Sequence, residues 1–140
     1  MHIACVLEPL TACMCEQKAK SEEFKAKANA CFQADQLNEA IELYISALEL
    51  NPANHILYAN RAFCHIKLEN YGSAIIDATE AINLEPSYIK GYYRRGSASF
   101  ALGKNKAAKK DFVVVCKMKP KDRDARAKLD AFAVLAAGGK

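Results

Sequence analysis

The sequence repeats itself every 34 residues, and this period constrains the fold more than any other feature. Pro52, Pro86 and Pro120 keep the interval. Small residues and large apolar residues form further columns with the same spacing. Columns in register over three copies indicate three structural repeats stacked on one another. The columns are Ala28, Ala62, Gly96; Ala40, Ala74, Ala108; Ala47, Ala81, Val115; Phe24, Tyr58, Tyr92; and Phe32, Ile66, Phe100.

Each unit contains two apolar-periodic stretches with a short break between them, and each ends at a proline. Proline cannot continue a helix, so a unit is predicted to be a helix, a turn and a second helix. Small residues in both helices allow close approach, and aromatic residues fill the space between units. The sequence therefore predicts an all-α fold with helices at about 18–34, 37–50, 54–68, 71–84, 88–102 and 105–118, and a capping helix at about 121–136.

The chain has the length of one domain, with 140 residues, 51% hydrophobic and 26% charged. A net charge of +4 does not by itself indicate that the protein binds nucleic acid, and no apolar run has the length of a membrane span. The six cysteines contain no CxxC pair and fit a reducing compartment, and neither a metal nor another cofactor is expected. We expect a flexible leader at 1–17, a helical-repeat domain at 18–137, and repeats at about 21–54, 55–88 and 89–122.

The densest cationic segment, at residues 88–95, begins the first helix of the third unit. Lys90 and Arg94 are four residues apart and project from one helical face, where like charges cost stability and so favour an anionic ligand. The first helices of the other units place Lys25 with Asn29, and Asn60 with Phe63 and Lys67, at similar spacings. Lysine, arginine and asparagine together suit a small dianion such as a polypeptide C-terminus bearing an acidic side chain.

A 34-residue helical hairpin with these columns resembles the tetratricopeptide repeat, over about residues 21 to 120. Such repeats form a right-handed superhelix with a concave groove lined by the first helix of each unit. Asn105 departs from the pattern, since the first two units have Leu37 and Tyr71 there, and we expect a looser turn in the last unit. Arg61 and Arg95 keep the period, as do Asp77 and Asp111, which predicts a structural ion pair within each unit rather than ligand contacts.

The polar groove residues resemble the dicarboxylate clamp of co-chaperone tetratricopeptide domains, which grip the C-terminal Glu-Glu-Val-Asp tail of heat-shock protein 90 and heat-shock protein 70. The resemblance implies that Lys25, Asn29 and Asn60 hold the terminal α-carboxylate. It implies that Lys90 takes the aspartate side chain and that Arg94 reaches the tail backbone or the preceding acid. Phe63 and Lys67 would contact upstream tail residues. A monomeric, cytoplasmic protein with the nucleus as a second location is expected, without nucleic-acid or membrane partners.

Three stretches, YIKGYYRRGSA at 88–98, NRAF at 60–63 and YGSAIIDAT at 71–79, resemble the N-terminal domain of the serine/threonine protein phosphatase type 5 family. The Gly-Asp and Gly-Asn-His signatures of phosphatase catalysis do not occur in the sequence, so we expect a binding module and not an enzyme. Two alternatives remain open: a regulatory arm that blocks a phosphatase active site until a chaperone tail competes, and a generic scaffold that binds an internal peptide by shape.

Overall fold

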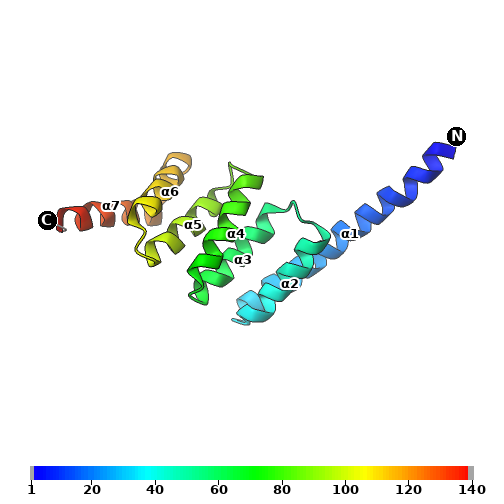
Figure 1. Cartoon of the computed structure of the whole chain (residues 1–140), viewed down its shortest axis with the longest axis horizontal. Coiled ribbons are helices and arrows are strands. Elements are labelled where there is room, and N and C mark those ends of the chain that lie inside the picture. Colours follow the sequence, from blue (N-terminus) through cyan, green and yellow to red (C-terminus); the bar gives the residue numbers. More distant parts are fainter. Residues whose placement is uncertain (1, 139–140) are drawn as a thin grey trace.

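The computed structural model describes the backbone of residues 2–138 and the side chains of residues 13–132. Over this range the protein forms helices only, as the sequence predicted, and none of the described helices is long and apolar enough to cross a membrane. Figure 1 shows them following one another along the long axis of the molecule. They are α1 (His2–Gln33), α2 (Leu37–Leu50), α3 (His55–Lys67), α4 (Tyr71–Leu84), α5 (Ile89–Ala101), α6 (Asn105–Met118) and α7 (Arg123–Gly138).

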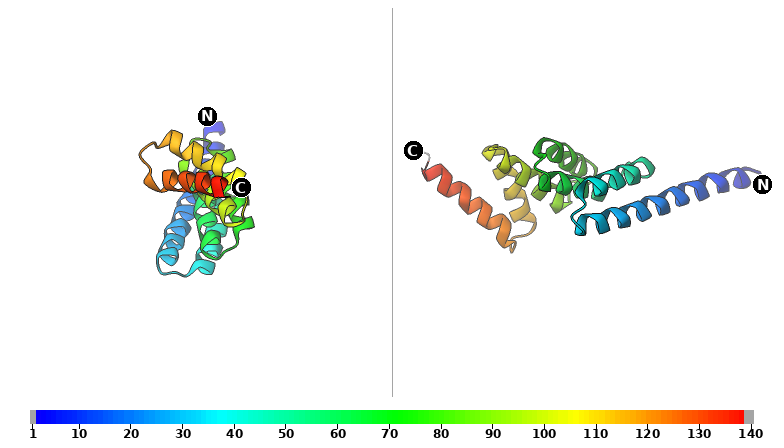
Figure 2. Two further views of the ribbon diagram at one scale, coloured as in Figure 1. Left: turned by 90° about the vertical axis from the view of Figure 1, so that its left-hand side faces the viewer. Right: turned by 90° about the horizontal axis from the view of Figure 1, so that it is seen from below.

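Three helical hairpins, α1–α2, α3–α4 and α5–α6, stack in sequence, and α7 packs on α6 at the end of the stack. Successive hairpins meet where α2 contacts α3 and α4 contacts α5, while α3 and α5 also touch each other. Figure 2 shows the α1–α2 hairpin and α7 at opposite ends of the molecule. The predicted stacking of three units with a capping helix is therefore confirmed.

The columns of small residues lie where the two helices of a hairpin cross. Ala28, Ala62, Ala40, Ala74 and Ala108 are fully buried. Gly96, in the same column as Ala28 and Ala62, is buried as well, and a Cβ atom there would lie 3.2 Å from the Asp111 Cβ and the Phe112 ring. A side chain at this position would push α5 away from α6, so the period in the sequence marks the contact that sets the spacing of each pair.

The turn inside each hairpin has the same geometry in all three repeats. Asp35, Glu69 and Gly103 have φ values of 63°, 63° and 78°, in the left-handed region. In each case this residue donates its N–H to the carbonyl three residues back, and the next residue donates to the carbonyl five residues back, at 2.8–3.1 Å. The looser third turn expected from Asn105 is therefore wrong, because a backbone pattern that Gly103 adopts without strain closes the turn.

The predicted ion pairs are confirmed, and each joins the two helices of its hairpin. Arg61 on α3 donates to the two carboxylate oxygens of Asp77 on α4 at 2.8 and 2.6 Å. Arg95 on α5 donates to Asp111 on α6 at 2.9 and 2.8 Å. Both carboxylates are buried. The two-point geometry satisfies these buried acids, which fixes the rotation of the helices about each other.

The helix boundaries match the sequence closely except at the N-terminus. The first helix begins at His2 and not at residue 18. From residue 10 to residue 33 the sequence contains no glycine or proline, and it is rich in the helix formers Ala, Lys, Glu, Gln and Met, so nothing stops the helix there. The described side chains at 13–20 are all exposed, so this part of α1 lies beyond the packed core. Of the six cysteines, Cys5 lies outside the described side chains.

Candidate functional site

The first helices of the three hairpins line a groove with two adjoining hollows. The smaller hollow has a volume of about 270 Å³ and receives side chains from α1, α2, α3 and α5. Three predicted ligand-binding residues line it, Asn29, Asn60 and Lys90, together with the predicted secondary contact Phe63. Residues separated by up to 61 positions in the sequence thus meet in one place because the hairpins stack.

Hydrogen bonds fix the orientation of the amides in the smaller hollow. The Tyr44 hydroxyl donates to the Asn29 side-chain oxygen, and the Asn60 amide nitrogen approaches the same oxygen at 3.5 Å. Burial raises the pKa of Tyr44 well above its ordinary value, so its hydroxyl remains a donor at neutral pH. With its oxygen occupied, Asn29 has its amide nitrogen available to donate to a ligand acceptor.

Lys25 differs from the other predicted residues because it does not line either hollow. Its ammonium forms an ion pair with Glu22 at 2.8 Å, one turn back along α1. Glu22 is exposed and Lys25 is half-buried, and a solvent-accessible ion pair of this kind contributes only about 0.2–1 kcal/mol. A ligand carboxylate could therefore compete for Lys25 at little cost.

The larger hollow has a volume of about 880 Å³ and continues the groove toward the turn between α6 and α7. Lys90 and Phe63 line both hollows, so they stand at the junction. Much of the lining is aromatic or aliphatic, and charged side chains stand at the far end. The remaining residues around it are Ile66, Ser87, Tyr88, Ile89, Tyr93, Arg94, Ser97, Lys119, Asp122, Asp124 and Lys128.

Arg94 is held over an aromatic platform in the groove wall. Its guanidinium carbon lies 3.6 Å from the centroid of the Phe63 ring, which itself packs on Phe32 with centroids 4.9 Å apart. Lys67, the other predicted secondary contact, is exposed and places its ammonium 4.7 Å from the Phe32 ring centroid. The two cations therefore flank one pair of tilted, packed rings, where cation–π attraction positions them.

The charge of Arg94 is not compensated within the described part of the protein. Burial lowers the pKa of Arg94, which nevertheless stays cationic at neutral pH. Among the described side chains no carboxylate forms an ion pair with it, whereas Arg61 and Arg95 are both paired. Lys90, on the same face of α5, is exposed and likewise has no carboxylate partner among those residues. A partly buried cation without a counter-charge favours an anionic ligand.

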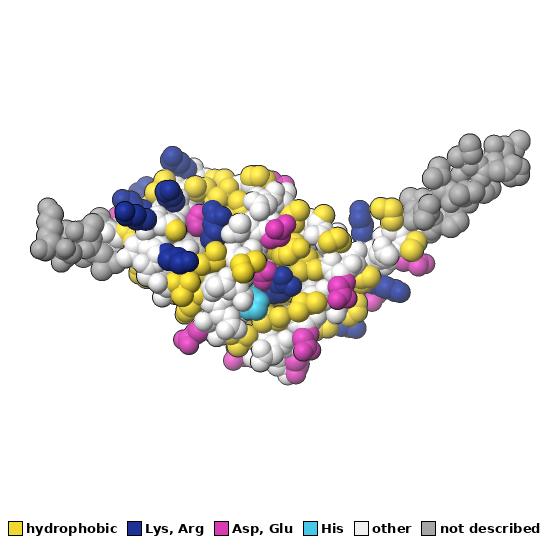
Figure 3. All heavy atoms as spheres, viewed as in Figure 1, with side chains coloured by type: hydrophobic (Ala, Val, Ile, Leu, Met, Phe, Trp, Pro, Cys, Tyr) yellow, Lys and Arg dark blue, Asp and Glu magenta, His cyan; other side chains and the backbone are white. Residues whose placement is uncertain are grey.

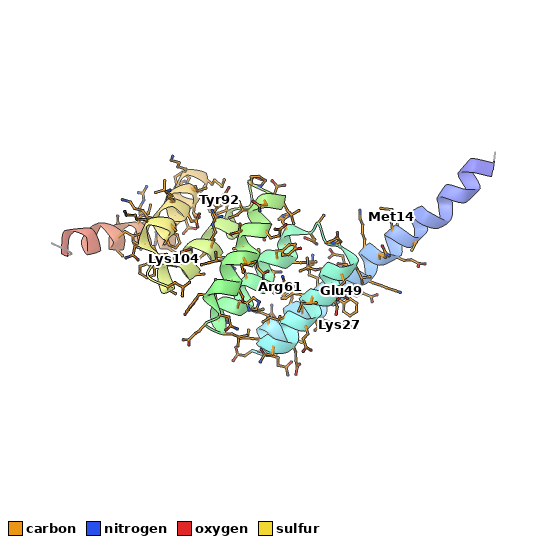
Figure 4. All side chains as sticks on the ribbon, in the orientation of Figure 1. Met14, Lys27, Glu49, Arg61, Tyr92 and Lys104 are labelled. Carbon is orange, nitrogen blue, oxygen red and sulfur yellow. The ribbon has the colours of Figure 1, made fainter. Side chains whose placement is uncertain are left out.

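Sequence reasoning missed several residues of the groove. Tyr44 comes from α2, a second helix of a unit, and its column continues with Ala78 and Phe112, which gives no polar signal. Lys128 comes from α7, outside the repeats, and donates to the Tyr93 hydroxyl at 2.7 Å. Of the three tyrosines at 88, 92 and 93, Tyr88 and Tyr93 line the larger hollow. Tyr92, labelled in Figure 4, lines neither hollow and donates to the Pro86 carbonyl at 2.9 Å.

Within the described residues, the structure shows neither a metal-binding cluster nor an activated thiol at Cys64. Side chains 13–132 contain no group of three or more His, Cys, Asp or Glu residues placed to hold a metal ion. Burial raises the pKa of the Cys64 thiol to about 11, which keeps it protonated and unreactive. The groove thus presents donors and cations for recognition.

Comparison with known proteins identifies the repeats. The family model described as "TPR repeat" matches residues 28–69, and the model "Tetratricopeptide repeat" matches 56–88 and 89–122. Serine/threonine-protein phosphatase 5 of Homo sapiens is 49% identical over 109 residues, which cover 78% of this chain and 22% of that protein. The chain therefore spans less than a quarter of the length of this relative.

Solved structures show the same architecture. The first TPR of Spaghetti (RPAP3) bound to HSP90 peptide SRMEEVD is 34% identical, with a TM-score of 0.84 over 86% of this chain and 95% of that one. The second TPR domain of the human RPAP3 protein in complex with HSP70 peptide SGPTIEEVD is 33% identical, with a TM-score of 0.77 over 86% and 98%. From its repeats, its stacked hairpins and these matches, the chain belongs to the tetratricopeptide repeat family, a non-catalytic binding fold.

Proposed function

We propose that this protein is a protein-binding adaptor that grips the acidic C-terminal Glu-Glu-Val-Asp tail of heat-shock protein 90, or of heat-shock protein 70, in its groove. The observation that carries the proposal is the uncompensated pair of cations on α5. Lys90 and Arg94 face the groove without carboxylate partners among the described residues, beside donors supplied by Asn29 and Asn60. This combination matches a ligand with two neighbouring carboxylates.

In this proposal the smaller hollow takes the end of the tail. Asn29 and Asn60 donate to the terminal α-carboxylate, and Lys25 exchanges its exposed Glu22 partner for the same group. Lys90, at the junction of the two hollows, receives the terminal aspartate side chain. Arg94 meets the preceding acid or the tail backbone, and Phe63 with Lys67 contacts residues further upstream. Each charge-assisted bond contributes on the order of 1.5–3 kcal/mol.

The likeness to other proteins supports this ligand. Two tetratricopeptide domains about one-third identical to this protein are solved with peptides that end in Glu-Glu-Val-Asp. The dense polar surface of the smaller hollow also fits a charged polypeptide end better than an apolar internal segment. As part of this proposal, the protein acts in the cytoplasm and nucleus and is not itself an enzyme.

The test is calorimetric titration of the peptide SRMEEVD into the protein and its variants. We expect affinity near 1 μM, equivalent to about −8 kcal/mol. Lys90→Ala and Arg94→Ala should each weaken binding about 10- to 100-fold, the value of one charge-assisted bond. Arg95→Ala is the matched control. Arg95 is adjacent to Arg94 but pairs with Asp111, so its substitution should change the affinity by less than about twofold. Equal losses in all three variants would contradict the assignment.

The likeness to the phosphatase favours a second candidate function, as the regulatory arm of such an enzyme. The 49% identity over 109 residues makes this protein the counterpart of one part of that relative. Added to a separately purified catalytic domain of that phosphatase, the protein should lower hydrolysis of a small phosphate ester, and SRMEEVD should restore it. Unchanged hydrolysis at saturating amounts of the protein would remove this function.

A further inference from the structure

The outer face of α6 carries a row of lysines that the groove does not use. Lys106, Lys110 and Lys117 are spaced at i, i+4 and i+11, with Lys109 beside them, and all four are exposed. The opposite face of the helix, with Ala108, Phe112 and Val115, is buried in the core. The one acid of α6, Asp111, is buried and paired with Arg95. The charged side chains on the solvent side of this helix are therefore all cationic.

The repeat fold does not require this charge, because none of the four equivalent positions in the first repeat is basic and two of them are acidic. Lys110, Val113 and Lys117 correspond, 68 positions earlier, to Glu42, Ile45 and Glu49 on α2. Residues 103–132 contain ten Lys and Arg against four Asp, a net charge of +6, although the whole protein has only +4. Figure 3 shows the basic side chains gathered over the end of the molecule that holds α6, and the acidic ones mostly toward the other end.

Between the lysines lies a shallow apolar hollow. Lys106, Lys109 and Lys110 surround Val113 and Val114, and the space has a volume of about 500 Å³. The valines are half-buried, so the floor is apolar while the rim is positively charged. None of these lysines forms an ion pair with a side chain in the described range 13–132. Their ammonium groups remain available to an external anion.

We propose that the outer face of α6 is a second docking surface, which binds an acidic protein segment with small apolar side chains between its carboxylates. Charge complementarity points to an acidic ligand, and the valine floor points to a ligand with apolar groups of matching size. Nucleic-acid surfaces typically use arginine forks and stacking aromatic residues, and α6 exposes neither. A bilayer surface favours large inserting side chains such as Trp, Phe or Leu, and this face offers two half-buried valines.

This surface is distinct from the groove. The groove is lined mainly by α1, α3 and α5 and reaches the α6–α7 turn only at Lys119 and the residues that follow it. The lysines of the α6 surface line neither groove hollow. A partner could therefore occupy the α6 surface while a peptide occupies the groove, and the proposal does not depend on the ligand proposed for the groove.

The experiment measures binding of a fluorescein-labelled peptide made of repeated Glu-Asp-Val, acetylated and C-terminally amidated, by fluorescence anisotropy. The test variant is Lys106→Glu/Lys110→Glu, and the control is Lys18→Glu/Lys20→Glu, which makes the same charge change at exposed positions of α1. We expect the test variant to weaken binding by about tenfold or more and the control by less than about twofold, because screened charges act locally. Lys90→Ala/Arg94→Ala should weaken binding less than the test variant does, because the amidated peptide lacks the carboxylate end proposed for the groove.

Two further arms make the proposal falsifiable. Replacing Val by Gly in the peptide should weaken binding, since the apolar floor loses its partner. Equal weakening by both charge-reversed variants, or loss of binding in Lys90→Ala/Arg94→Ala, would overturn the proposal. Tighter binding to phosphatidylserine vesicles or single-stranded DNA than to the peptide, at the same salt, would overturn it in favour of those ligands. Circular dichroism should show that each charge-reversed variant is folded, because the substituted lysines are exposed.

Discussion

Two neighbouring arginines have different surroundings in this protein, and the difference is set by one residue on the next helix. Arg95 points between α5 and α6 and meets Asp111, while Arg94 points into the groove and stacks on Phe63. The sequence predicted this division because Arg95 has a counterpart, Arg61, and both have an aspartate 16 residues later. Arg94 breaks the repeat, since Asn60 and Ala26 stand at its equivalent positions. Departure from the period thus marks the residues available for binding.

The Arg95–Asp111 pair yields a prediction on stability. Arg95→Ala leaves the Asp111 carboxylate buried without its two-point partner. Because the Arg95 side chain is itself partly exposed, water compensates in part, and we expect a loss of about 2 kcal/mol in the free energy of unfolding. Urea denaturation followed by circular dichroism measures it. A variant as stable as the original protein would show that the pair is only a surface contact.

His65 makes stability depend on pH. Burial lowers the pKa of His65 below its ordinary value, although Asp77, 3.6 Å away, opposes the shift. The unfolded protein therefore takes up a proton before the folded protein does as pH falls. The contribution of His65 is complete above about pH 6.5, the unfolded pKa, and is lost as pH drops through the lower folded value.

The repeat supplies a matched variant for this test. The third repeat has buried Ser99 at the position of His65, so His65→Ser preserves the fold without the titrating group. The melting temperature of the original protein should fall more steeply between pH 7.5 and 5.5 than that of His65→Ser. Parallel pH profiles would contradict the assignment.

Between the helices, the residue with positive φ in each turn allows a direct test of how the turn contributes to stability. Gly103 has φ of +78°, and a Cβ atom there would meet no other atom within 4 Å. Gly103→Ala should therefore destabilise the protein only through backbone strain, by about 1 kcal/mol. Glu69 adopts the same conformation with a side chain, so Glu69→Gly should be neutral or stabilising. Thermal melts of both variants check the opposite signs; destabilisation of similar size by both changes would refute this account.

Most of the helical architecture was predictable because proline positions and the 34-residue period act together. The bounds predicted for α2, α4 and α6 agree with the structure. The start of α1 could not be predicted from the sequence. The segment before residue 18 contains no clear helix-stop signal, and the exposed side chains at 13–20 make no core contact that would give the sequence an apolar pattern. The third turn is as tight as the others despite Asn105, because Gly103 adopts the left-handed φ value that closes the turn.

The groove was predicted less completely than the helices. Asn29, Asn60 and Lys90 lie together as the sequence indicated, and Arg94 adjoins them in the larger hollow. The sequence could not show that Lys25 is engaged with Glu22, because Glu22 is exposed, Lys25 is only half-buried, and the pairing depends on side-chain rotamers. It also could not place Lys128 in the groove, since only the packing of α7 on α6 brings that residue to Tyr93.

At the scale of the whole molecule, the groove is a cationic surface exposed to solvent, so salt should weaken its interaction with an acidic peptide. The screening length falls from roughly 8 Å at 0.15 M salt to roughly 3 Å at 1 M. We expect the affinity for SRMEEVD to fall by about an order of magnitude over this range. Lys90→Ala should flatten this dependence, whereas Asn60→Ala, which removes a neutral donor, should lower affinity and keep the slope. Affinity indifferent to salt would indicate an apolar mode of binding.

We propose that the stacked hairpins together form a receptor for a polypeptide end, and changing the chemistry of that end tests this proposal. Titration of the protein with SRMEEVD should be compared with titration of the same peptide carrying a C-terminal amide. The amide removes one negative charge and one acceptor oxygen from the group that Asn29, Asn60 and Lys25 are proposed to hold, while every side chain stays the same. We predict that amidation weakens binding at least about 100-fold, the equivalent of about 2.7 kcal/mol. Equal affinity for the two peptides would contradict the account and would favour a scaffold that binds internal segments by shape.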